Sequence, residues 1–272
     1  MSVKARWPKL VLAGTIGALC GWHLLVLLQG SRLPINLDEL NFVQEALRLP
    51  AEHRLASYGH PLRQRFSADS DFFVQQKCRA LMRYLKPRLP KASLRILDAG
   101  CGQGASVPFL RNDARVIGTD PSLPMLREAV HHGPVVMQEP FDLPFRDGTF
   151  DAAFAFCVYH HIDDREHVRH LRELTRVVAP GGYVCIFEHN PFNPVTARIF
   201  NRCPIDRGCH MIRPARLRAI FREAGLQEIA QGYLLFMPES VWKVLGFLEP
   251  ALAWLPLGGQ YFVAGRKSGK LA

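Results

Sequence analysis

The sequence predicts an α/β fold built around a mostly parallel sheet, and three observations lead to that prediction. From Leu94 onward, short apolar runs typical of strands alternate with amphipathic segments typical of helices, the pattern of a sheet with helices on both faces. One run, "RILDAGCGQG" at 95–104, reaches an acid that is followed by three glycines at every second position. The next strand-like run, "ARVIGTD", also ends in an acid, Asp120.

Each element follows from its own pattern. The predicted strands are short runs rich in β-branched and aromatic residues: 94–100, 114–120, 133–138, 149–159, 183–189, 226–236 and 259–267. The predicted helices show apolar residues at helical spacing: 36–50, 69–90, 104–112, 122–132, 163–179 and 213–225. Prolines stop the first two of these helices, and the Pro-Gly-Gly at 180–182 is expected to end the fifth.

Composition bounds the size and the class of the protein. The 272 residues are 48% apolar, which suffices for one mid-sized domain with extensions or for two small domains. The net charge of +10 indicates either an ordinary basic surface or attraction to an acidic partner, such as phospholipid head groups, a phosphorylated substrate or nucleic acid.

Cysteine usage indicates a reducing compartment and no disulfide framework. There are seven cysteines, an odd number, and several lie within apolar runs, where cysteine behaves as a small hydrophobic residue. Cys203, Cys209 and His210 form C-x5-C-H, which is not a standard zinc spacing and has no second cluster to complete it. The sequence therefore predicts no metal site.

The three glycines are accounted for if they form the first strand-to-helix turn of the sheet. There the chain must turn sharply, a ligand can approach the backbone closely, and a helix N-terminus offers free N–H groups. The pattern is D-x-G-x-G-x-G, from Asp98 to Gly104, rather than the G-x-G-x-x-G of dinucleotide enzymes. An acid before the glycines suits a cationic ligand better than a pyrophosphate, and Asp120 is placed to accept ribose hydroxyls.

The segment from Leu94 to Pro194 resembles class I S-adenosylmethionine-dependent methyltransferases, in the small-molecule branch that includes quinone-biosynthesis enzymes. Four motifs carry the resemblance in the family's order: "LDAGCGQG", "VIGTDPS", "LPFRDGTFDAAFAFCVYHHI" and "LRELTRVVAPGGYVCIFEHNP". The resemblance implies a Rossmann-like, seven-stranded sheet whose final strand, "GQYFVAGRK", is antiparallel. It also implies that the cofactor is S-adenosylmethionine.

The same resemblance implies a set of cofactor-binding residues. The glycine turn and Asp98 would line the methionine and ribose side, Asp120 would hold the ribose hydroxyls, and Glu139 would meet the adenine amino group. The complete set is Asp98, Ala99, Gly100, Cys101, Gly102, Asp120, Pro121, Glu139 and Cys157. Ser122 would flank the adenine with Pro121, and Phe156 is the alternative to Cys157 at the end of the fourth strand.

Catalytic candidates follow the fourth and fifth strands. Methyl transfer needs alignment of donor and acceptor, and a hydroxyl acceptor also benefits from a base. His161 is the first candidate for that base and His160 the second, although a histidine at a helix entry can equally be structural. Glu188 and His189, in "EHNPFNP", complete the set; that loop either binds the acceptor or is merely shaped by its prolines.

A later segment, at about 195–258, is expected to cover the substrate. Its first part contains seven arginines between Ala197 and Arg222, which form either a solvated helix face or a clamp for a phosphate or head group. Its second part, "YLLFMPESVWKVLGFLEPALAWLPLGG", is rich in Leu, Trp and Phe. An apolar cover beside arginines suits an amphiphilic acceptor with an anionic head.

The N-terminal run Leu10–Leu28 is apolar, lacks formal charge and is long enough to span a bilayer. Lys4, Arg6 and Lys9 precede it, no convincing cleavage site follows, and the positive-inside rule places the N-terminus in the cytoplasm. A full span would export the rest of the chain, away from a cytosolic cofactor. The run can instead lie in the membrane interface or pack on the protein's own surface.

These observations predict three regions and one function. The regions are a membrane-prone segment at 1–33, a helical extension at 34–92 and a methyltransferase domain at 93–272. The predicted function is methyl transfer to a lipid-linked or apolar small molecule, at a hydroxyl, by a membrane-associated protein whose catalytic domain faces the cytoplasm. The alternatives are a protein or RNA methyltransferase and a non-catalytic cofactor-binding protein; nucleic acid is not expected as a partner, because no RNA-binding module is recognisable.

Overall fold

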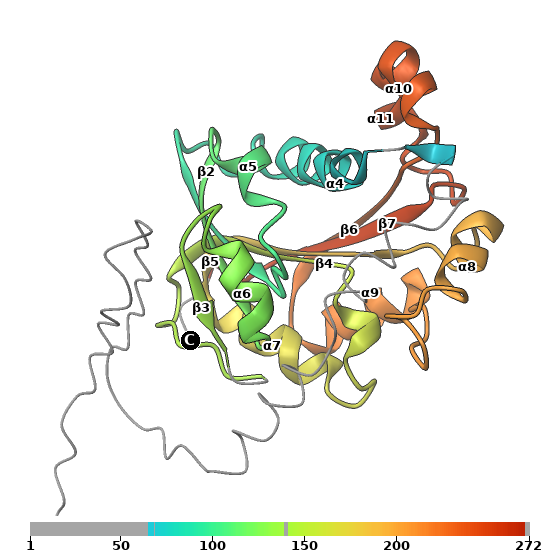
Figure 1. Cartoon of the computed structure of the whole chain (residues 1–272). Coiled ribbons are helices and arrows are strands. Elements are labelled where there is room, and N and C mark those ends of the chain that lie inside the picture. The colour runs from blue at the N-terminus through green and yellow to red at the C-terminus, as the bar shows by residue number, and fades with distance from the viewer. Residues whose placement is uncertain (1–64, 68, 139–140, 270–272) are drawn as a thin grey trace, which may run out of the picture.

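The computed structural model describes residues 65–67, 69–138 and 141–269. These residues form one seven-stranded sheet, in the order β3-β2-β1-β4-β5-β7-β6, with helices packed on both faces (Figure 1). Neighbouring strands are parallel except at β7, which runs antiparallel to both β5 and β6. The predicted sheet, with its antiparallel final strand, is confirmed.

The strands lie within or next to the predicted segments. They are β1 (Leu94–Ala99), β2 (Ala114–Asp120), β3 (Val135–Met137), β4 (Phe150–Phe156), β5 (Val178–His189), β6 (Gln227–Leu234) and β7 (Gln260–Arg266). One difference concerns the Pro-Gly-Gly at 180–182, which lies inside β5 instead of directly ending a helix. The pairing of β4 with β5 is irregular between Phe150 and Ala152, so the Pro-Gly-Gly forms a bulge in β5.

The helices of the core cover the sheet from both sides. They are α4 (Ser70–Leu85), α5 (Val107–Leu110), α6 (Leu123–Ala129), α7 (His167–Val177) and α9 (Pro214–Glu223). The shorter elements are η1 (Tyr159–His161), α8 (Pro194–Phe200), α10 (Glu239–Leu245), η2 (Gly246–Leu248) and α11 (Glu249–Leu252). The predicted helix at 36–50 lies outside the described residues.

Two buried clusters hold the sheet and helices together. On one face, α4 buries Phe72, Leu81 and Leu85 against strand residues of β1, β2 and β4. On the other face, α7 and α9 pack their apolar sides against β4 and β5. Helix α4 belongs to the predicted extension at 34–92, yet it packs on the sheet of the predicted methyltransferase domain.

The topology brings four strand ends together. β1, β2, β4 and β5 are parallel, so Ala99, Asp120, Phe156 and His189 end at the same edge of the sheet. Such an edge is where doubly wound sheets bind ligands. Among residues 65–67, 69–138 and 141–269, no helix is both long and apolar enough to cross a bilayer. The run Leu10–Leu28 lies outside these residues.

Candidate active site

The glycine turn after β1 uses its three glycines for different reasons. Gly100, Gly102 and Gly104 have φ of +75°, +52° and +76°, the left-handed region that favours glycine. A Cβ at Gly100 would lie 2.5 Å from the Val158 side chain, and one at Gly104 would lie 3.1 Å from the Ala129 backbone. A Cβ at Gly102 would meet no atom within 4 Å. Packing therefore requires the outer glycines, whereas Gly102 borders open space.

Asp120, at the end of β2, accepts hydrogen bonds from the backbone of this turn and of the residues after β2. The backbone N–H of Gly102 donates to its Oδ2 at 2.9 Å, and that of Ser122 donates to its Oδ1 at 2.8 Å. Burial raises the pKa of Asp120, and these two N–H donors oppose the rise. Each carboxylate oxygen keeps further acceptor capacity, so the group can receive two hydroxyls from a ligand above the turn.

Asp98 is the buried acid of β1, only 2% exposed. Burial raises its pKa to about 7, although the Ser106 side chain and the nearby Lys77 charge both oppose the rise. The Ser106 hydroxyl donates to its Oδ2. A carboxyl poised in this way becomes ionised when a cation binds beside it.

The remaining predicted cofactor residues take supporting positions. Ala99 is fully buried, and the Cys101 thiol packs so closely on β2 that a Cβ at Gly118 would lie 2.7 Å from it. Pro121 directly follows Asp120, and Ser122 precedes α6. Glu139 lies outside the described residues, so its predicted contact stays a prediction.

The open space at Gly102, the acceptor pair of Asp120 and the buried acid Asp98 fit S-adenosylmethionine. This cofactor has a ribose diol and a cationic methionine end, and the turn offers an oxygen pair for the first and an acid for the second. The side chain of Thr119 adds a buried hydroxyl that has no hydrogen-bond partner among the described residues. The cofactor set predicted from the sequence is thus brought to one place, apart from Glu139.

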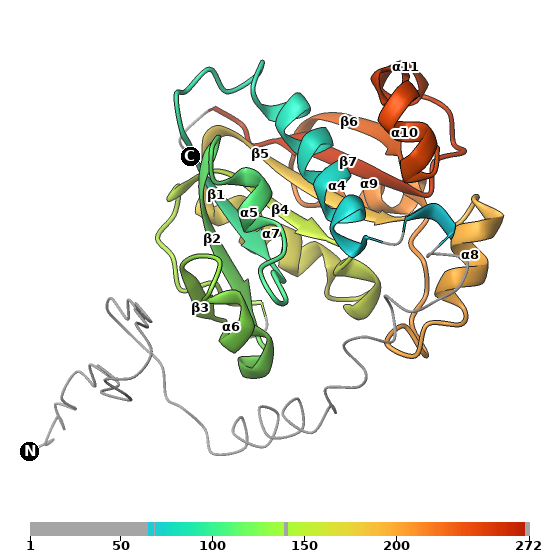
Figure 2. The same ribbon diagram turned by 45° about the horizontal axis from the view of Figure 1, so that its top comes forward.

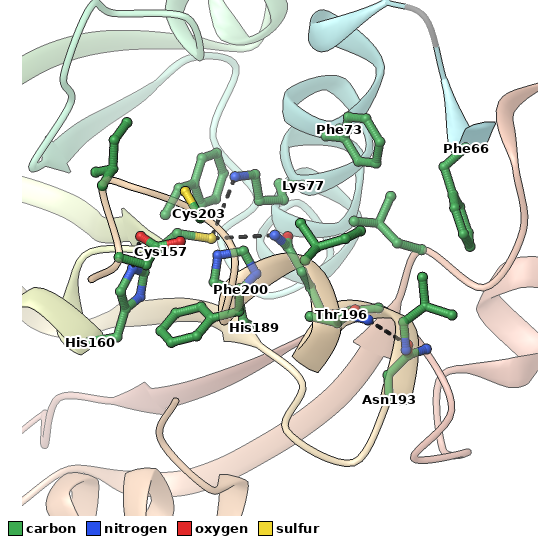
Figure 3. A pocket seen from close by; sticks show the side chains of 18 of the residues that line it. Phe66, Phe73, Lys77, Cys157, His160, His189, Asn193, Thr196, Phe200 and Cys203 are labelled. Atoms are coloured by element: carbon green, nitrogen blue, oxygen red, sulfur yellow. Dashed lines mark hydrogen bonds and ion pairs between the residues drawn. The ribbon is translucent and has the colours of Figure 1, made fainter. Parts of the chain in front are cut away.

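A cavity of about 300 Å³ lies beyond the ends of β4 and β5 (Figure 3). Its walls come from α4, η1, α8, the loop after α8, the residue that follows β6 and the start of β7. Most of its lining is apolar, including Phe66, Phe73, Phe156 and Phe200. Cys157 lines the cavity as well, so the cavity begins at the predicted cofactor-binding edge of the sheet.

Three polar side chains converge at the inner end of this cavity. Lys77 Nζ lies 3.9 Å and Gln260 Nε2 lies 3.3 Å from the Cys157 Sγ. Burial raises the pKa of the Cys157 thiol, which therefore stays protonated and is a poor nucleophile. Lys77 is 8% exposed and stacks over the Phe156 ring at 4.9 Å, and no carboxylate of the described residues forms an ion pair with it.

A buried network fixes the loop after β4 to the end of β5. Glu188 is fully buried and accepts from the Tyr159 N–H at 2.8 Å and from His160 Nδ1 at 2.7 Å. The second nitrogen of His160 lies 3.4 Å from an oxygen of Asp206. Burial opposes a charge on His160, but the two carboxylates outweigh it and raise its pKa to about 10. The two carboxylates therefore favour the protonated form of His160, and this geometry favours a structural role over that of a base.

The other two histidines of the cavity, His161 and His189, both have lowered pKa values. Burial lowers the pKa of His161, and so does the charge of His160; its Nδ1 lies 3.3 Å from Cys209 Sγ and its Nε2 lies 3.6 Å from Asp206. Burial and the His160 charge lower the pKa of His189 to about 4. Both rings line the cavity, so the assignment of the base to His161 stays a prediction, with His189 as its neighbour.

The described residues contain one histidine–carboxylate group compact enough for a metal ion, His160, His161 and Asp206, whose ligand atoms lie within 4.8 Å of one another. It is not the C-x5-C-H considered from the sequence.

The arginines predicted to form a clamp lie outside the lining of the cavity. Most are exposed, and Arg216 pairs with Glu223 at 3.0 Å on the surface of α9. This arrangement agrees with the alternative of a solvated helix face.

Sequence reasoning missed Lys77, Gln260 and Asp206. Lys77 carried a signal, because it lies between Phe73 and Leu81 at helical spacing, on the apolar side of α4. Gln260 and Asp206 gave no such signal in the sequence, since they lie in a strand and a loop that the resemblance does not cover strongly.

Comparisons with known proteins bear on the family and the fold. The family described as "Methyltransferase domain" matches residues 97–186. The chain is similar to a demethylmenaquinone methyltransferase of Corynebacterium kroppenstedtii, 37% identical over 114 residues that cover 41% of this chain and 49% of that protein. It is also similar to a tRNA (carboxymethyluridine(34)-5-O)-methyltransferase of Arabidopsis thaliana, 38% identical over 100 residues, or 36% of this chain and 24% of the relative. The chain thus spans half or less of the length of these relatives.

The solved structures agree on the fold. A crystal structure of a SAM-dependent methyltransferase from Archaeoglobus fulgidus is similar with a TM-score of 0.55, covering 73% of this chain and 100% of the other at 20% identity. The family match, the sheet order and the glycine turn with its two acids lead to one conclusion: the chain contains a class I S-adenosylmethionine-dependent methyltransferase domain.

Proposed function

We propose that this protein transfers the methyl group of S-adenosylmethionine to a hydroxyl of an apolar or lipid-linked small molecule. The observation that supports this most is the largely apolar cavity beside the glycine turn, which begins at Cys157. When bound, the cofactor supplies an electrophilic methyl group on a cationic sulfur. The domain has to align the acceptor with that methyl and to exclude water, and an apolar cavity does both.

The residues of the chain take the following roles in this proposal. Asp120 holds the ribose hydroxyls, Asp98 supports the cationic methionine end, and Gly102 leaves the space that the cofactor fills. The aromatic walls around Phe156 orient the acceptor. His161 or His189 would receive the hydroxyl proton as the methyl–oxygen bond forms and the methyl–sulfur bond breaks. This role requires a neutral imidazole, and the lowered pKa of each ring favours that form.

The proposal includes a membrane location. Residues 10–28 attach the chain to the membrane, with the catalytic domain on the cytoplasmic side, where the cofactor is available. The length and apolar character of that run and the basic residues before it support this assignment.

A protein or RNA acceptor is the competing function, favoured by the net charge of +10 and by the likeness to a tRNA methyltransferase. The test is to incubate the full chain with methyl-labelled S-adenosylmethionine and a membrane-containing extract, then to separate organic, aqueous, protein and RNA fractions. Label in the organic phase that disappears with Asp120→Ala supports the apolar acceptor. Label in protein or RNA contradicts it, as does label that remains with Asp120→Ala.

The two glycines Gly102 and Gly104 are expected to respond differently to alanine. Each substitution places a side chain at positive φ, which costs about 1–2 kcal/mol. Gly104→Ala also pushes a Cβ to 3.1 Å from the Ala129 backbone, so it lowers the free energy of unfolding further. Gly102→Ala meets no protein atom but fills the cofactor's space, so it weakens binding more than it weakens the fold. Denaturation and cofactor titration of both variants check this; equal effects of the two on binding would contradict it.

Cofactor affinity is expected to rise with pH through the titration of Asp98. Its pKa in the free protein is about 7, and the ionised form is the one that attracts a cationic ligand. Affinity should therefore rise about tenfold from one pH unit below this pKa to one unit above it. Calorimetric titration across this range checks the slope, and Asp98→Asn should flatten it. A wild-type affinity that falls with pH would contradict the role given to Asp98.

A further inference from the structure

The segment between β6 and β7, residues 236–258, presents a concentration of exposed apolar side chains. They are Val241, Val244, Leu245, Phe247, Leu248, Trp254 and Leu257, and Phe247 and Trp254 are each 75% exposed. We propose that this segment, which comprises α10, η2 and α11, is a bilayer-contacting surface at the rim of the acceptor cavity.

The exposure is not the result of a loose loop, because polar contacts hold the segment from beneath. Glu249 is buried and accepts from the N–H groups of Leu235 and Phe236 and from Trp242 Nε1. Further along, Asn190 Nδ2 donates to the carbonyls of residues 256 and 258 at 3.0 and 2.7 Å. The structure thus fixes one side of the segment to the domain and leaves the apolar side outward.

The residues that flank the segment place it at the cavity. Leu235 and Gly259 both line the cavity, and the N–H of Gly259 donates to the carbonyl of Leu235 at 3.0 Å. The apolar segment is therefore joined at both ends to the wall of the cavity.

The first described residues lie beside this segment. The Ser67 hydroxyl donates to the Glu239 carboxylate of α10 at 2.6 Å.

Shape and charge favour a lipid surface over a protein groove or a nucleic acid. α10 and α11 project from the body of the domain in both views (Figures 1 and 2), which suits insertion into an interface. The segment 236–258 contains only three charged residues, Glu239, Lys243 and Glu249. Glu239 pairs with Lys243 at 2.9 Å and Glu249 is buried, so no free acid repels anionic head groups. Exposed Trp and Phe are the residues that enter the interfacial region.

The surface stands on these observations alone, while its use as an entrance for the acceptor rests on the proposed function. An acceptor dissolved in the bilayer would reach the cavity without crossing water. The methyl donor would reach the glycine turn from the aqueous side.

The experiment is hydroxyl-radical footprinting of the full chain, read by mass spectrometry, with and without vesicles of mixed zwitterionic and anionic phospholipids. Oxidation of Phe247 and Trp254 should fall severalfold with vesicles, whereas oxidation of Met137, which is 47% exposed on β3, should not change. The double variant Phe247→Ser, Trp254→Ser should bind vesicles about 100-fold more weakly in flotation. Each side chain contributes separately to the binding free energy, so the two losses in affinity multiply. The control Met137→Ser should bind as the wild type does.

Three outcomes would overturn the proposal. In the first, Phe247 and Trp254 are equally oxidised with and without vesicles, although the full chain floats with them. In the second, both are already protected without lipid, which means that another part of the chain or a second copy covers them. In the third, the double variant binds vesicles as tightly as the wild type. Because none of these readouts depends on methyl transfer, failure here and failure of the proposed acceptor are distinguishable.

Discussion

Replacement of Asp120 by alanine is expected to lower the affinity for S-adenosylmethionine by roughly 100-fold or more, because two hydrogen bonds from ribose hydroxyls to a carboxylate are lost. The variant also loses the two contacts that hold the turn, to the N–H groups of Gly102 and Ser122. Asp120→Asn keeps one acceptor oxygen and should lose less. Calorimetric titration of the cofactor measures both effects.

The matched control is Asp113→Ala, just before the opposite end of the same strand. Asp113 forms a surface ion pair with Lys86 at 2.6 Å, away from the turn. Its replacement should therefore leave the cofactor affinity unchanged. Comparable losses with Asp113→Ala and Asp120→Ala would mean that general damage to the strand, rather than the ribose contact, explains the result.

Glu188→Ala should produce the largest loss of stability, about 3–5 kcal/mol, because it leaves the buried His160 without its main carboxylate. For a domain of this size that corresponds to a fall of about 10 °C in Tm. Glu188→Gln, which keeps the acceptor for the Tyr159 N–H, should lose less. The exposed pair Arg216–Glu223 gives the control, since Glu223→Ala should cost less than about 1 kcal/mol.

The pH dependence of the Glu188 effect has a definite sign. The pKa of His160 is about 10 in the folded protein and about 6.5 when unfolded, so folding favours the charged form. The stabilisation is complete below about pH 6.5 and is lost as the pH rises through about 10. The free energies of unfolding of wild type and Glu188→Ala should therefore differ most at about pH 6 and progressively less toward pH 10. A difference that grows with pH would show that His160 is neutral in the folded state.

The fold and the cofactor side were predictable because their signals are local. A glycine at positive φ and an acid at a strand end are visible in a few residues, as for Gly102 and Asp120, and strands alternate with helices within short windows. The one clear misreading of local pattern concerned Pro180 and the two glycines after it, which form a bulge inside β5 instead of a turn. Nothing in the composition of that stretch distinguishes the two.

The acceptor side was predictable only in outline because its contacts are long-range. Lys77 and Cys157 are 80 residues apart and Cys157 and Gln260 are 103 apart, so no window shows that they meet. The state of His160 depends on Asp206, a loop residue with no motif around it. The sequence ranked His161 before His160 as the base, but it gave no sign of the two carboxylates, Glu188 and Asp206, that lie beside His160.

The strand order has a consequence for the order of folding. Each of β2 to β5 can pair with a strand already synthesised, but β6 cannot join the sheet until β7 lies between it and β5. β7 is far from β5 in the sequence, and strands that are far apart pair late because the entropy cost of closing the loop comes before any contact forms. Gly259 and Gln260, which begin this final hairpin strand and line the cavity, are therefore expected to dock after the glycine turn exists. In kinetic refolding, competence to bind the cofactor should appear before competence to enclose an acceptor.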